Sequence, residues 1–382
     1  MAIDPVELTQ ALIRCPSVTP DAGSALDLVE RELAGLGFAC HRLRFEEFGT
    51  APVDNLYARL GSSGPHLAFA GHVDVVPPGD VAAWTADPFG GEVRDGMVWG
   101  RGAADMKSGV AAFVAAVSAH LEQRKLDRGS ISLLITGDEE GVAVNGTVKI
   151  LAWMAERGEQ PDACLVGEPT SPRILGDMAK IGRRGSANVT LVVHGRQGHT
   201  AYPHRADNAA HRLVAMLAGM IAEPLDAGSA LFEPSTLQVT TVDVGNPASN
   251  VVPARAEAHI NIRYNDLHDA ASLERWLRRH CDAVGGRYDL DLRSSGDAFF
   301  TAPGPLSERL SESVEAVTGR RPELSTSGGT SDARFVRAYC PVIEFGLVGA
   351  TMHQVDERVA VADIEALTRI YRHFIGRWLA DV

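Results

Sequence analysis

The chain has 382 residues, 45% of them hydrophobic, so it can bury a large core and is expected to form two domains or one domain with an insertion. Its 36 basic and 49 acidic residues give a net charge of -13, which disfavours nucleic acid as a partner, because nucleic-acid-binding proteins gather lysine and arginine. The five cysteines are scattered without CxxC spacing, which argues against a disulfide framework or a zinc ribbon and favours a cytoplasmic location. Neither an export signal nor an apolar run long enough to span a membrane is visible.

The first 180 residues show the pattern of an α/β domain. A helix is predicted to begin at Asp4, with Pro5 in its first turn, and a second helix is predicted to stop at Gly37. Short apolar runs then alternate with longer helical patterns. The runs cover 66–71, 131–136 and 162–167, and the helical patterns cover 109–121 and 146–158. This alternation predicts a mostly parallel sheet with flanking helices.

Residues 181–294 are predicted to form an inserted domain. A strand over 188–195 is followed by a helix over about 208–221, strands over 235–245 and 254–264, a helix through Leu273 and Leu277, and a strand over 287–294. The order β-α-β-β-α-β is that of a ferredoxin-like unit. The α/β pattern then resumes with an apolar run over 340–348 and a closing helix over 361–379, so 1–180 and 295–382 are expected to form one domain.

Polar residues gather just past the carboxyl ends of the predicted strands. They are His72, Asp74, Glu139, Glu140, Glu168 and His353, and a further acid, Asp105, lies in a glycine-rich stretch before a helix. In open α/β sheets such strand ends meet in one crevice. Imidazoles and carboxylates suit zinc or a similar divalent ion, which keeps an open position when it is catalytic. A single histidine in such a place is more often structural, but the repeated placement at strand ends favours a metal site.

Two of these acids, Glu139 and Glu140, are adjacent. Neighbouring carboxylates repel each other unless a cation lies between them or one is protonated, and a pair of metal ions would resolve the conflict. Asp74 lies two residues after His72, so in an extended segment it can reach the far nitrogen of that histidine and fix its tautomer. The alternatives are a turn or helix cap for Asp74 and a solvated loop carboxylate for Glu139.

Several motifs together resemble the M20 family of dinuclear zinc amidohydrolases. They are GHVDVVPPGDVAAWTADPF, DGMVWGRGAADMKSG, TGDEEG, LVGEPT, GRRGS, QGHTAYPH, TSGGTSDAR and ATMHQVDE. The resemblance covers nearly the whole chain, from about Ser17 to Val359, in order and with family-like spacing. Within the family the motifs are most similar to those of members that hydrolyse N-succinyl-LL-2,6-diaminopimelate to succinate and LL-2,6-diaminopimelate, in lysine and cell-wall precursor synthesis.

The resemblance implies two Zn2+ ions per subunit and a ligand set for each. Asp105 matches the carboxylate that bridges the ions. His72 and Glu168 match the other ligands of one ion, and Glu140 and His353 match those of the second. Co2+ or Mn2+ can substitute for Zn2+, because nitrogen and oxygen ligands suit all three metals.

The resemblance also implies catalytic roles outside the ligand set. Glu139 matches the general base, which takes a proton from the attacking water and passes it to the departing amine. Asp74 matches the partner of the first histidine. His199 matches a group that stabilises the tetrahedral oxyanion and reaches across from the partner subunit's inserted domain.

Substrate carboxylates require local arginines on this acidic chain. Arg183 and Arg184 in GRRGS, with Arg263 in INIRY, are similar to the family's carboxylate-binding arginines; the alternative is arginines solvated on a sheet surface. The resemblance implies further contacts, for which the alternative is a tight turn, at Ser186, Tyr202, Asn250, Gly329 and Thr330. Gly349 departs from the family pattern, because many relatives carry an asparagine there.

The leading hypothesis is therefore a homodimeric amide hydrolase of small molecules. Residues 1–180 and 295–382 would form the zinc-hydrolase domain, and 181–294 the dimerisation and lid domain. One rival keeps the chemistry and changes the substrate, as in an acetylornithine deacetylase or a dipeptidase. A second rival is a non-catalytic binding protein on the same fold, and a third is a single structural metal, although no cysteine falls in these motifs.

Overall fold

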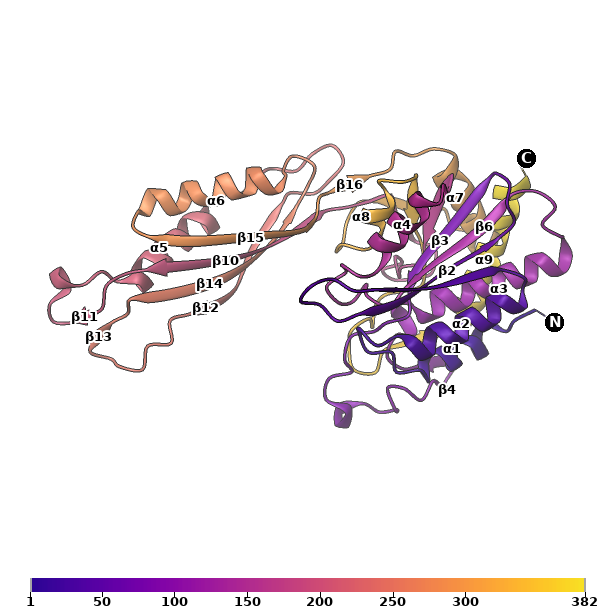
Figure 1. Ribbon diagram of the computed structural model, residues 1–382, viewed down its shortest axis with the longest axis horizontal. Helices are drawn as coiled ribbons and strands as arrows, with labels where there is room; N and C mark the ends of the chain where they lie inside the picture. The colour runs from indigo at the N-terminus through magenta and orange to yellow at the C-terminus, as the bar shows by residue number, and fades with distance from the viewer. Residues whose placement is uncertain (1, 381–382) are drawn as a thin grey trace. The chain divides into compact units, whose positions relative to one another are not determined.

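The computed structural model of the protein describes residues 2–380, which divide into two compact units (Figure 1). Of the described residues, unit 1 comprises 2–181, Thr301–Ser325 and 331–380. Unit 2 comprises Gly182–Phe300 and Thr326–Thr330. In the described part of the chain no helix is both long and apolar enough to cross a membrane.

Unit 1 is built on an eight-stranded sheet with the order β1-β2-β6-β3-β7-β18-β8-β17. Its central strands β6, β3, β7 and β18 are parallel, and β1 and β2 form an antiparallel edge. The strands are β1 (Ala39–Phe45), β2 (Val53–Leu60), β3 (His66–His72), β6 (Ser130–Thr136), β7 (Ala163–Val166), β8 (Met178–Lys180), β17 (Glu323–Ser325) and β18 (Val342–Glu344). The predicted α/β class, with a mostly parallel sheet, is confirmed.

Helices surround this sheet. They are α1 (Pro5–Ile13), α2 (Gly23–Gly35), α3 (Ser108–Gln123), α4 (Thr147–Glu156), α7 (Pro305–Thr318), α8 (Ala333–Val336) and α9 (Val361–Ala380). Asp4 caps α1 as predicted, because its carboxylate accepts hydrogen bonds from Val6 N and Glu7 N. Helices α1, α3, α7 and α9 pack on one another, and α2 and α4 pack on β2 and β6.

An aromatic cluster fixes the long helices α3 and α9 to the centre of the sheet. Phe69 of β3 stacks on Phe113 of α3 with ring centroids 4.1 Å apart, and Tyr371 of α9 meets both rings edge-on. The Tyr371 hydroxyl donates a hydrogen bond to Phe345 O at 2.6 Å, so the buried phenol is satisfied. All four side chains are fully buried.

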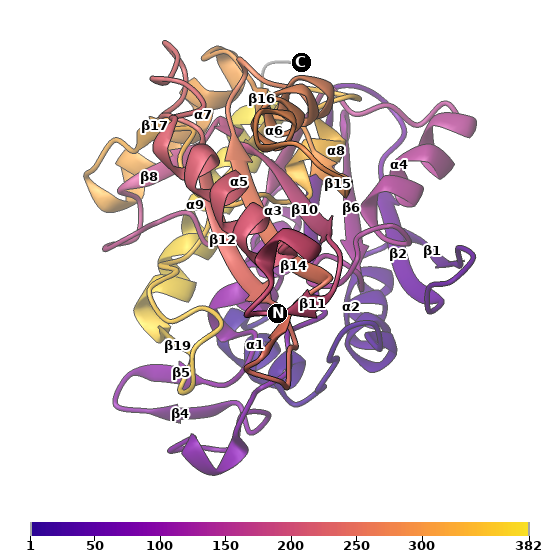
Figure 2. The ribbon, with the colours of Figure 1, turned by 90° about the vertical axis from the view of Figure 1, so that its left-hand side faces the viewer.

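Unit 2 is a four-stranded antiparallel sheet with two helices on one face. Figures 1 and 2 show the two helices, α5 and α6, next to each other. The strand order is β12-β14-β10-β15, with β10 (Gly185–His194), β12 (Thr236–Asp243), β14 (Arg255–Tyr264) and β15 (Tyr288–Gly296). The helices are α5 (Ala209–Ala222) and α6 (Ala270–Val284). Alternate strand residues such as Val189, Leu191 and Ile260 pack against Leu213 and Leu277 of the helices. The chain order of these elements is the predicted β-α-β-β-α-β.

Several short elements complete the structure. The strands are β4 (Glu92–Arg94), β5 (Met97–Trp99), β9 (Gly182–Arg183), β11 (Gly198–His199), β13 (Val251–Val252), β16 (Phe299–Phe300) and β19 (Arg358–Ala360). The helical turns are η1 (Val81–Ala83), η2 (Ala103–Lys107) and η3 (Pro203–Arg205). The three-stranded sheet β19-β5-β4 was not predicted, because its strands are only three residues long and β19 is more than 250 residues from β5 along the chain.

Candidate metal centre and active site

The polar residues that follow β3, β6 and β7 lie close together because these three strands are parallel neighbours. His72 is the last residue of β3 and is paired with Thr136, the last residue of β6. One ligand atom from each of His72, Asp105 and Glu140 lies within 4.8 Å of the others. The same holds for a second group, which is His72, Glu139 and Glu168.

Asp105 lies between the two histidines. Its Oδ1 is 3.1 Å from His72 Nε2, and its Oδ2 is 3.4 Å from His353 Nε2. Each histidine also faces a glutamate, since His72 Nε2 lies 3.8 Å from Glu168 Oε1 and His353 Nε2 lies 2.8 Å from Glu140 Oε1. The structure thus brings together all five residues predicted as ligands, with Asp105 in the middle.

The start of α3 places Asp105 by close backbone packing. Asp105 (φ -126°, ψ 100°) is extended within η2, so its carboxylate projects beside the strand ends before the helix proper begins. A Cβ added to Gly109 would lie 2.6 Å from Gly167 O, which no side chain tolerates. Glycine at 109 therefore lets the first turn of α3 approach the end of β7, where Glu168 follows.

The charged forms of the buried carboxyl groups in the site are disfavoured when no cation is nearby. Burial raises the pKa of Glu139 well above its usual value, and the charge of Asp332 raises it further. Burial also raises the pKa of Glu168 well above its usual value, with a further contribution from Asp105. Positive charge is therefore required for these carboxylates to ionise together.

The pKa values of the two histidines are also raised, which for an imidazole favours the charged form. Burial alone would lower the pKa of His72, but hydrogen bonds with Asp105 and Asp74 raise it well above its usual value. Hydrogen bonds with Asp105 and Glu140 raise the pKa of His353 to about 10. The surrounding carboxylates thus attract positive charge at both imidazoles.

This donor set fits divalent metal ions. Two imidazole nitrogens and three carboxylates converge, and nitrogen and oxygen are the donors that zinc and its neighbours accept. The His72 side chain is 1% exposed, whereas that of His353 is 48% exposed, so one side of the set is open to solvent. Such an arrangement is suited to a catalytic metal site rather than to a closed structural one.

Asp74 holds the loop that carries the adjacent glutamates. Its Oδ1 accepts a hydrogen bond from Glu139 N at 3.3 Å, and its Oδ2 accepts one from Glu140 N at 3.1 Å. His72 Nδ1 lies 2.9 Å from the Asp74 main-chain oxygen and 3.6 Å from the Asp74 carboxylate. The carbonyl is therefore the nearer partner of the imidazole, while the carboxylate fixes the backbone of the loop.

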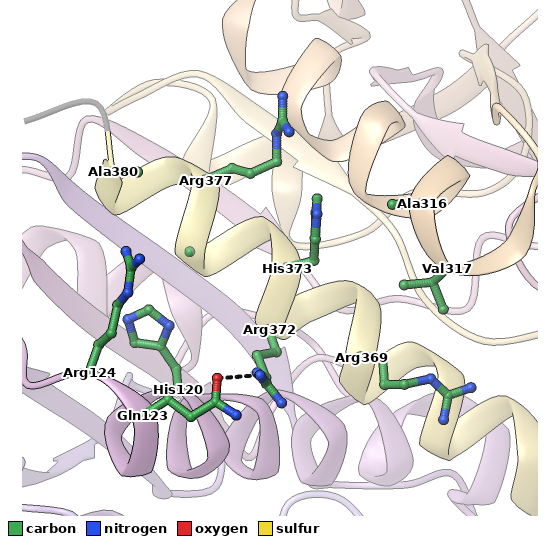
Figure 3. A pocket seen from close by; sticks show the side chains of 11 residues that line it. His120, Gln123, Arg124, Ala316, Val317, Arg369, Arg372, His373, Arg377 and Ala380 are labelled. Carbon is green, nitrogen blue, oxygen red and sulfur yellow. Dashed lines mark hydrogen bonds between the residues drawn. The ribbon is translucent and has the colours of Figure 1, made fainter.

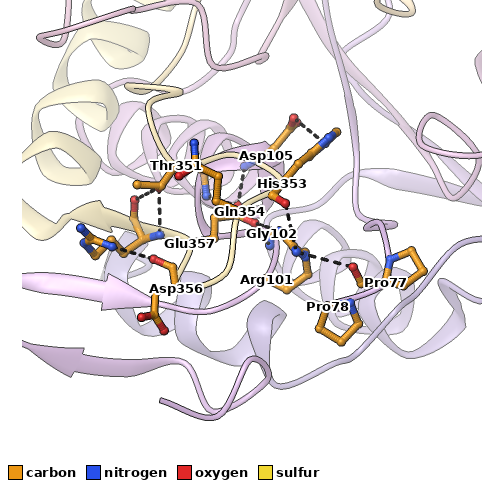
Figure 4. Close-up of polar contacts among 12 residues, drawn as sticks. Pro77, Pro78, Arg101, Gly102, Asp105, Thr351, His353, Gln354, Asp356 and Glu357 are labelled. Atoms are coloured by element: carbon orange, nitrogen blue, oxygen red, sulfur yellow. Dashed lines mark hydrogen bonds and ion pairs between the residues drawn. The ribbon is translucent and has the colours of Figure 1, made fainter. Parts of the chain in front are cut away.

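Two residues that sequence reasoning missed, Glu357 and Arg101, join the loops of Asp105 and His353 (Figure 4). Glu357 accepts hydrogen bonds from Gly102 N at 3.2 Å and from Asp105 N at 3.1 Å, and it pairs with Arg101 at 2.7 Å. Arg101 also donates to His353 O at 3.5 Å. The sequence signals were the positions of the two residues in quoted motifs, with Glu357 four residues after His353 and Arg101 four residues before Asp105.

The remaining predicted site residues belong to unit 2 and form two groups within it. One group is near the start of β10, where Ser186 pairs with Arg263 across the sheet and Arg263 Nη1 donates to Thr330 Oγ1 at 3.1 Å. Burial and the charge of Arg184 lower the pKa of Arg263. The residues assigned to this group are Arg183, Arg184, Ser186, Arg263, Gly329 and Thr330.

The second group lies beyond the other end of β10. The rings of His199 and Tyr202 are 5.7 Å apart, and Thr200 N donates to Asn250 O at 3.1 Å. The strand between the groups, from Ser186 to His194, spans about 26 Å at a rise of about 3.3 Å per residue. Within one chain, His199 is therefore far from Arg263.

Residues 68–377 match peptidase family M20/M25/M40. The chain belongs to this family. The M20 assignment from the sequence motifs is confirmed, and the protein is accordingly an enzyme of the metallohydrolase class.

Curated relatives of this M20 protein match it along its whole length. The succinyl-diaminopimelate desuccinylase of Rhodospirillum centenum is 63% identical over 380 residues, covering 100% of this chain and 98% of the relative. That of Rhodopseudomonas palustris is 55% identical and covers 99% of each chain.

Solved structures of M20 proteins share the fold. The metallo-carboxypeptidase Sso-CP2 of Sulfolobus solfataricus has a TM-score of 0.82 at 17% identity and covers 99% of each chain. The YXEP protein of Bacillus subtilis, described as a dinuclear metal binding peptidase, has a TM-score of 0.73 at 14% identity, covering 99% of this chain and 98% of that one.

Proposed function

We propose that the protein hydrolyses N-succinyl-LL-2,6-diaminopimelate to succinate and LL-2,6-diaminopimelate, a step of lysine biosynthesis. The observation that carries this proposal is the 63% identity over the full chain to an enzyme of that activity. It is supported by the intact donor set and by the half-buried side chain of Glu139 beside it. A non-catalytic binding protein would not need this set to be complete.

Two Zn2+ ions per subunit are the proposed cofactors, with Co2+ or Mn2+ as substitutes. His72 and Glu168 would hold one ion, Glu140 and His353 the other, and Asp105 both. When bound, such ions supply positive charge that polarises the scissile carbonyl and acidifies a water molecule. The distances among these five side chains support this division, because each histidine faces one glutamate and shares Asp105.

Glu139 is proposed to move the proton of the reaction. Its carboxylate accepts a proton from the attacking water and delivers it to the amide nitrogen that leaves as the amine of diaminopimelate. Asp74 positions Glu139 by accepting its backbone N–H. It also accepts the N–H of Glu140, so that one side chain orients both the proposed base and a proposed ligand.

Arg183, Arg184 and Arg263, with Ser186, Gly329 and Thr330, are proposed to bind substrate carboxylates. Arg263 is half-buried, and its guanidinium is already oriented by Asn261 at 3.1 Å and Thr330 at 3.1 Å. A pre-oriented, partly desolvated guanidinium binds a carboxylate with two parallel hydrogen bonds. Tyr202 and Asn250 are proposed to act with His199, which they accompany in the other group.

A homodimer through unit 2 is proposed to bring the two groups together from different subunits. The span of about 26 Å along β10 supports this, because a chain's own His199 is remote from its own Arg263. The outer face of α5 supports it too. Val214 and Ile221 are exposed and lie two helical turns apart, on a different side of the helix from its buried residues. Beside them, β12 is a sheet edge whose residues are largely exposed.

A cytoplasmic location is also proposed. Its support is that all five cysteines are free thiols, three of them buried, as expected for a protein of a reducing compartment.

The test of the proposed activity is hydrolysis of N-succinyl-LL-2,6-diaminopimelate, followed by release of the primary amine. Removal of metal with a chelator should abolish turnover, and two equivalents of Zn2+ per chain should restore it. Assays with N-acetylornithine and simple dipeptides test the alternative activities, those of an acetylornithine deacetylase and of a dipeptidase. Faster turnover of any of those compounds than of the succinyl substrate would overturn the proposal.

A further inference from the structure

A second, basic pocket lies in unit 1, between α3, α7 and α9, and has a volume of about 540 Å³ (Figure 3). We call it the arginine pocket. Its charged and titratable lining residues are His120, Arg124, Arg369, Arg372, His373 and Arg377. His120 lies 15 residues beyond Asp105, mostly along α3, which corresponds to about 22 Å at 1.5 Å per residue. The arginine pocket is therefore separate from the candidate metal centre.

One wall of the pocket is a basic stripe of α9. Arg369, Arg372, His373 and Gly376 occupy positions i, i+3, i+4 and i+7, so they form one stripe of α9. The buried face of α9 is apolar, whereas this exposed to half-buried stripe, which borders α3 and α7, is basic. At Gly376 an added Cβ would lie 4.0 Å from the His120 ring, so packing alone does not require glycine there. Its lack of a side chain leaves the pocket open, at the cost of helix propensity.

The positive charge of the pocket is not balanced from within. In residues 2–380 its lining includes no aspartate or glutamate. Arg377 pairs with Glu312 of α7, and Arg372 donates to the neutral amide of Gln123. Arg124 and Arg369 form no ion pair in the described part of the chain and are exposed. This concentration of charge occurs on a chain whose net charge is -13.

Two observations describe the positive potential of the pocket. Burial and the charges of Arg124 and Arg372 lower the pKa of His120, and burial and Arg377 lower the pKa of His373. The pocket thus disfavours further positive charge. Cations at the end of α3 stabilise the helix dipole, which explains His120 and Arg124, but Arg369 lies in the middle of α9 and gains nothing in this way.

We propose that the arginine pocket binds a small molecule that carries two or more carboxylate or phosphate groups. Guanidinium groups form paired, charge-assisted hydrogen bonds with both kinds of oxyanion. The volume lies within the range of small-molecule sites, about 300–1,000 Å³, and Ala316 and Val317 add an apolar wall for the body of the ligand. The ligand would neutralise Arg124 and Arg369, which form no ion pair within residues 2–380.

Isothermal titration calorimetry on the zinc-loaded protein tests this proposal. Inorganic pyrophosphate and propane-1,2,3-tricarboxylate, each titrated at constant ionic strength, probe the phosphate and the carboxylate class. At least one is expected to bind saturably, with one molecule per chain. Saturable binding of one probe alone would support the proposal and identify the class. The absence of saturable binding by both probes would overturn it.

Variants locate the binding. Arg124→Gln and Arg369→Gln are each expected to weaken it about tenfold or more. Gly376→Met should weaken it as well, by filling the pocket without changing charge. Arg31→Gln, which removes an exposed arginine from α2, is the control for net charge and should change affinity less than about twofold. Hydrolysis without added anion should be unchanged in all four variants, which shows that they are folded.

Heat from chelation of active-site metal would be equal in all of these proteins. Binding that survives unchanged in both Arg124→Gln and Arg369→Gln would therefore place the anion elsewhere and overturn the proposal.

Discussion

Glu357 pairs with Arg101 at 2.7 Å, and side-chain exposure is 0% for the glutamate and 3% for the arginine. The two oxygens of Glu357 also accept the backbone N–H groups of Gly102, Ala104 and Asp105. Glu357 thus holds the segment 102–105, which ends in the proposed metal ligand Asp105. Glu357 itself lies four positions after a second proposed ligand, His353 (Figure 4). Glu357 is a positioning residue for both loops.

Glu357→Gln is expected to destabilise the protein and to weaken metal binding. Gln retains the shape but leaves the buried guanidinium of Arg101 without a counter-charge, which typically costs about 3–5 kcal/mol. Urea unfolding measures the stability, and atomic absorption after dialysis measures bound metal. Glu32→Gln removes one partner of the exposed Arg31 pair and serves as control, with little expected change. Wild-type metal retention by Glu357→Gln would contradict the positioning role.

Glu139→Gln is expected to lower kcat by about 10² to 10⁴, because it removes proton transfer while leaving the proposed metal ligands in place. Zinc content should stay near that of the wild type. Glu140→Gln, at the adjacent position, should instead lose metal, because its side chain faces His353 at 2.8 Å. Normal turnover by Glu139→Gln would remove the assigned role of that residue.

The two histidines should differ in their effect on metal content. His353 is 48% exposed at the rim, and His72 is 1% exposed within the sheet. His353→Ala is therefore expected to remain folded and to retain about one zinc ion per chain. His72→Ala should lose its ion and also be destabilised, because it leaves a cavity beside Asp105 and Asp74. Equal loss of metal from both variants, with unchanged stability, would contradict the division into two sites.

Much of this arrangement could be predicted from the sequence because it follows from local rules. Apolar runs alternating with helical patterns predict parallel strands, and polar residues just after such runs must then meet at one edge of the sheet. His72, Glu140, Glu168 and His353 were found in this way, Asp105 was found in a glycine-rich stretch before a helix, and the structure brings the five together. Their roles as ligands stay a prediction.

What sequence reasoning missed depends on contacts between distant segments. The pair of Glu357 and Arg101 joins positions 256 residues apart, and although both residues lie in quoted motifs, nothing local shows that they meet. The basic stripe of α9 reads as an ordinary solvated helix face until α3 and α7 are packed beside it. For Asp74 the two-residue spacing was informative, but it could not show that the carboxylate holds the backbone of the next loop instead of lying nearest to the imidazole.

Arg263→Lys is expected to raise KM for the succinyl substrate about tenfold or more, with a smaller effect on kcat. Arg263 donates to Asn261 through Nε and to Thr330 through Nη1, and a single ammonium cannot keep both contacts and also bind a carboxylate with two hydrogen bonds. Steady-state kinetics check this prediction. Arg293→Lys, at an exposed position of β15, is the matched control. An unchanged KM in Arg263→Lys would exclude this arginine from substrate binding.

The stability of unit 1 should depend on pH through His66. Burial, and then the charge of Arg59, lower the pKa of its imidazole to about 4 from the usual 6.5. The ring lies 2.7 Å from Ser132 Oγ and 3.3 Å from Gln160 O. Because the folded-state pKa is depressed, the unfolded chain binds the proton first as the pH falls. The contribution of the neutral imidazole to the free energy of unfolding is therefore full above about pH 7. It is lost as the pH falls from 6.5 towards 4.

His66→Gln has no titrating ring, so the stability difference between wild type and variant should shrink on acidification. Between pH 7.5 and 5 the change should be about 2 kcal/mol in favour of the variant, by the linkage relation for this shift. Urea unfolding at both pH values measures it, and His204→Gln, at an exposed position, controls for the loss of an imidazole elsewhere. A difference that is the same at both pH values would show that His66 does not remain neutral in the folded protein.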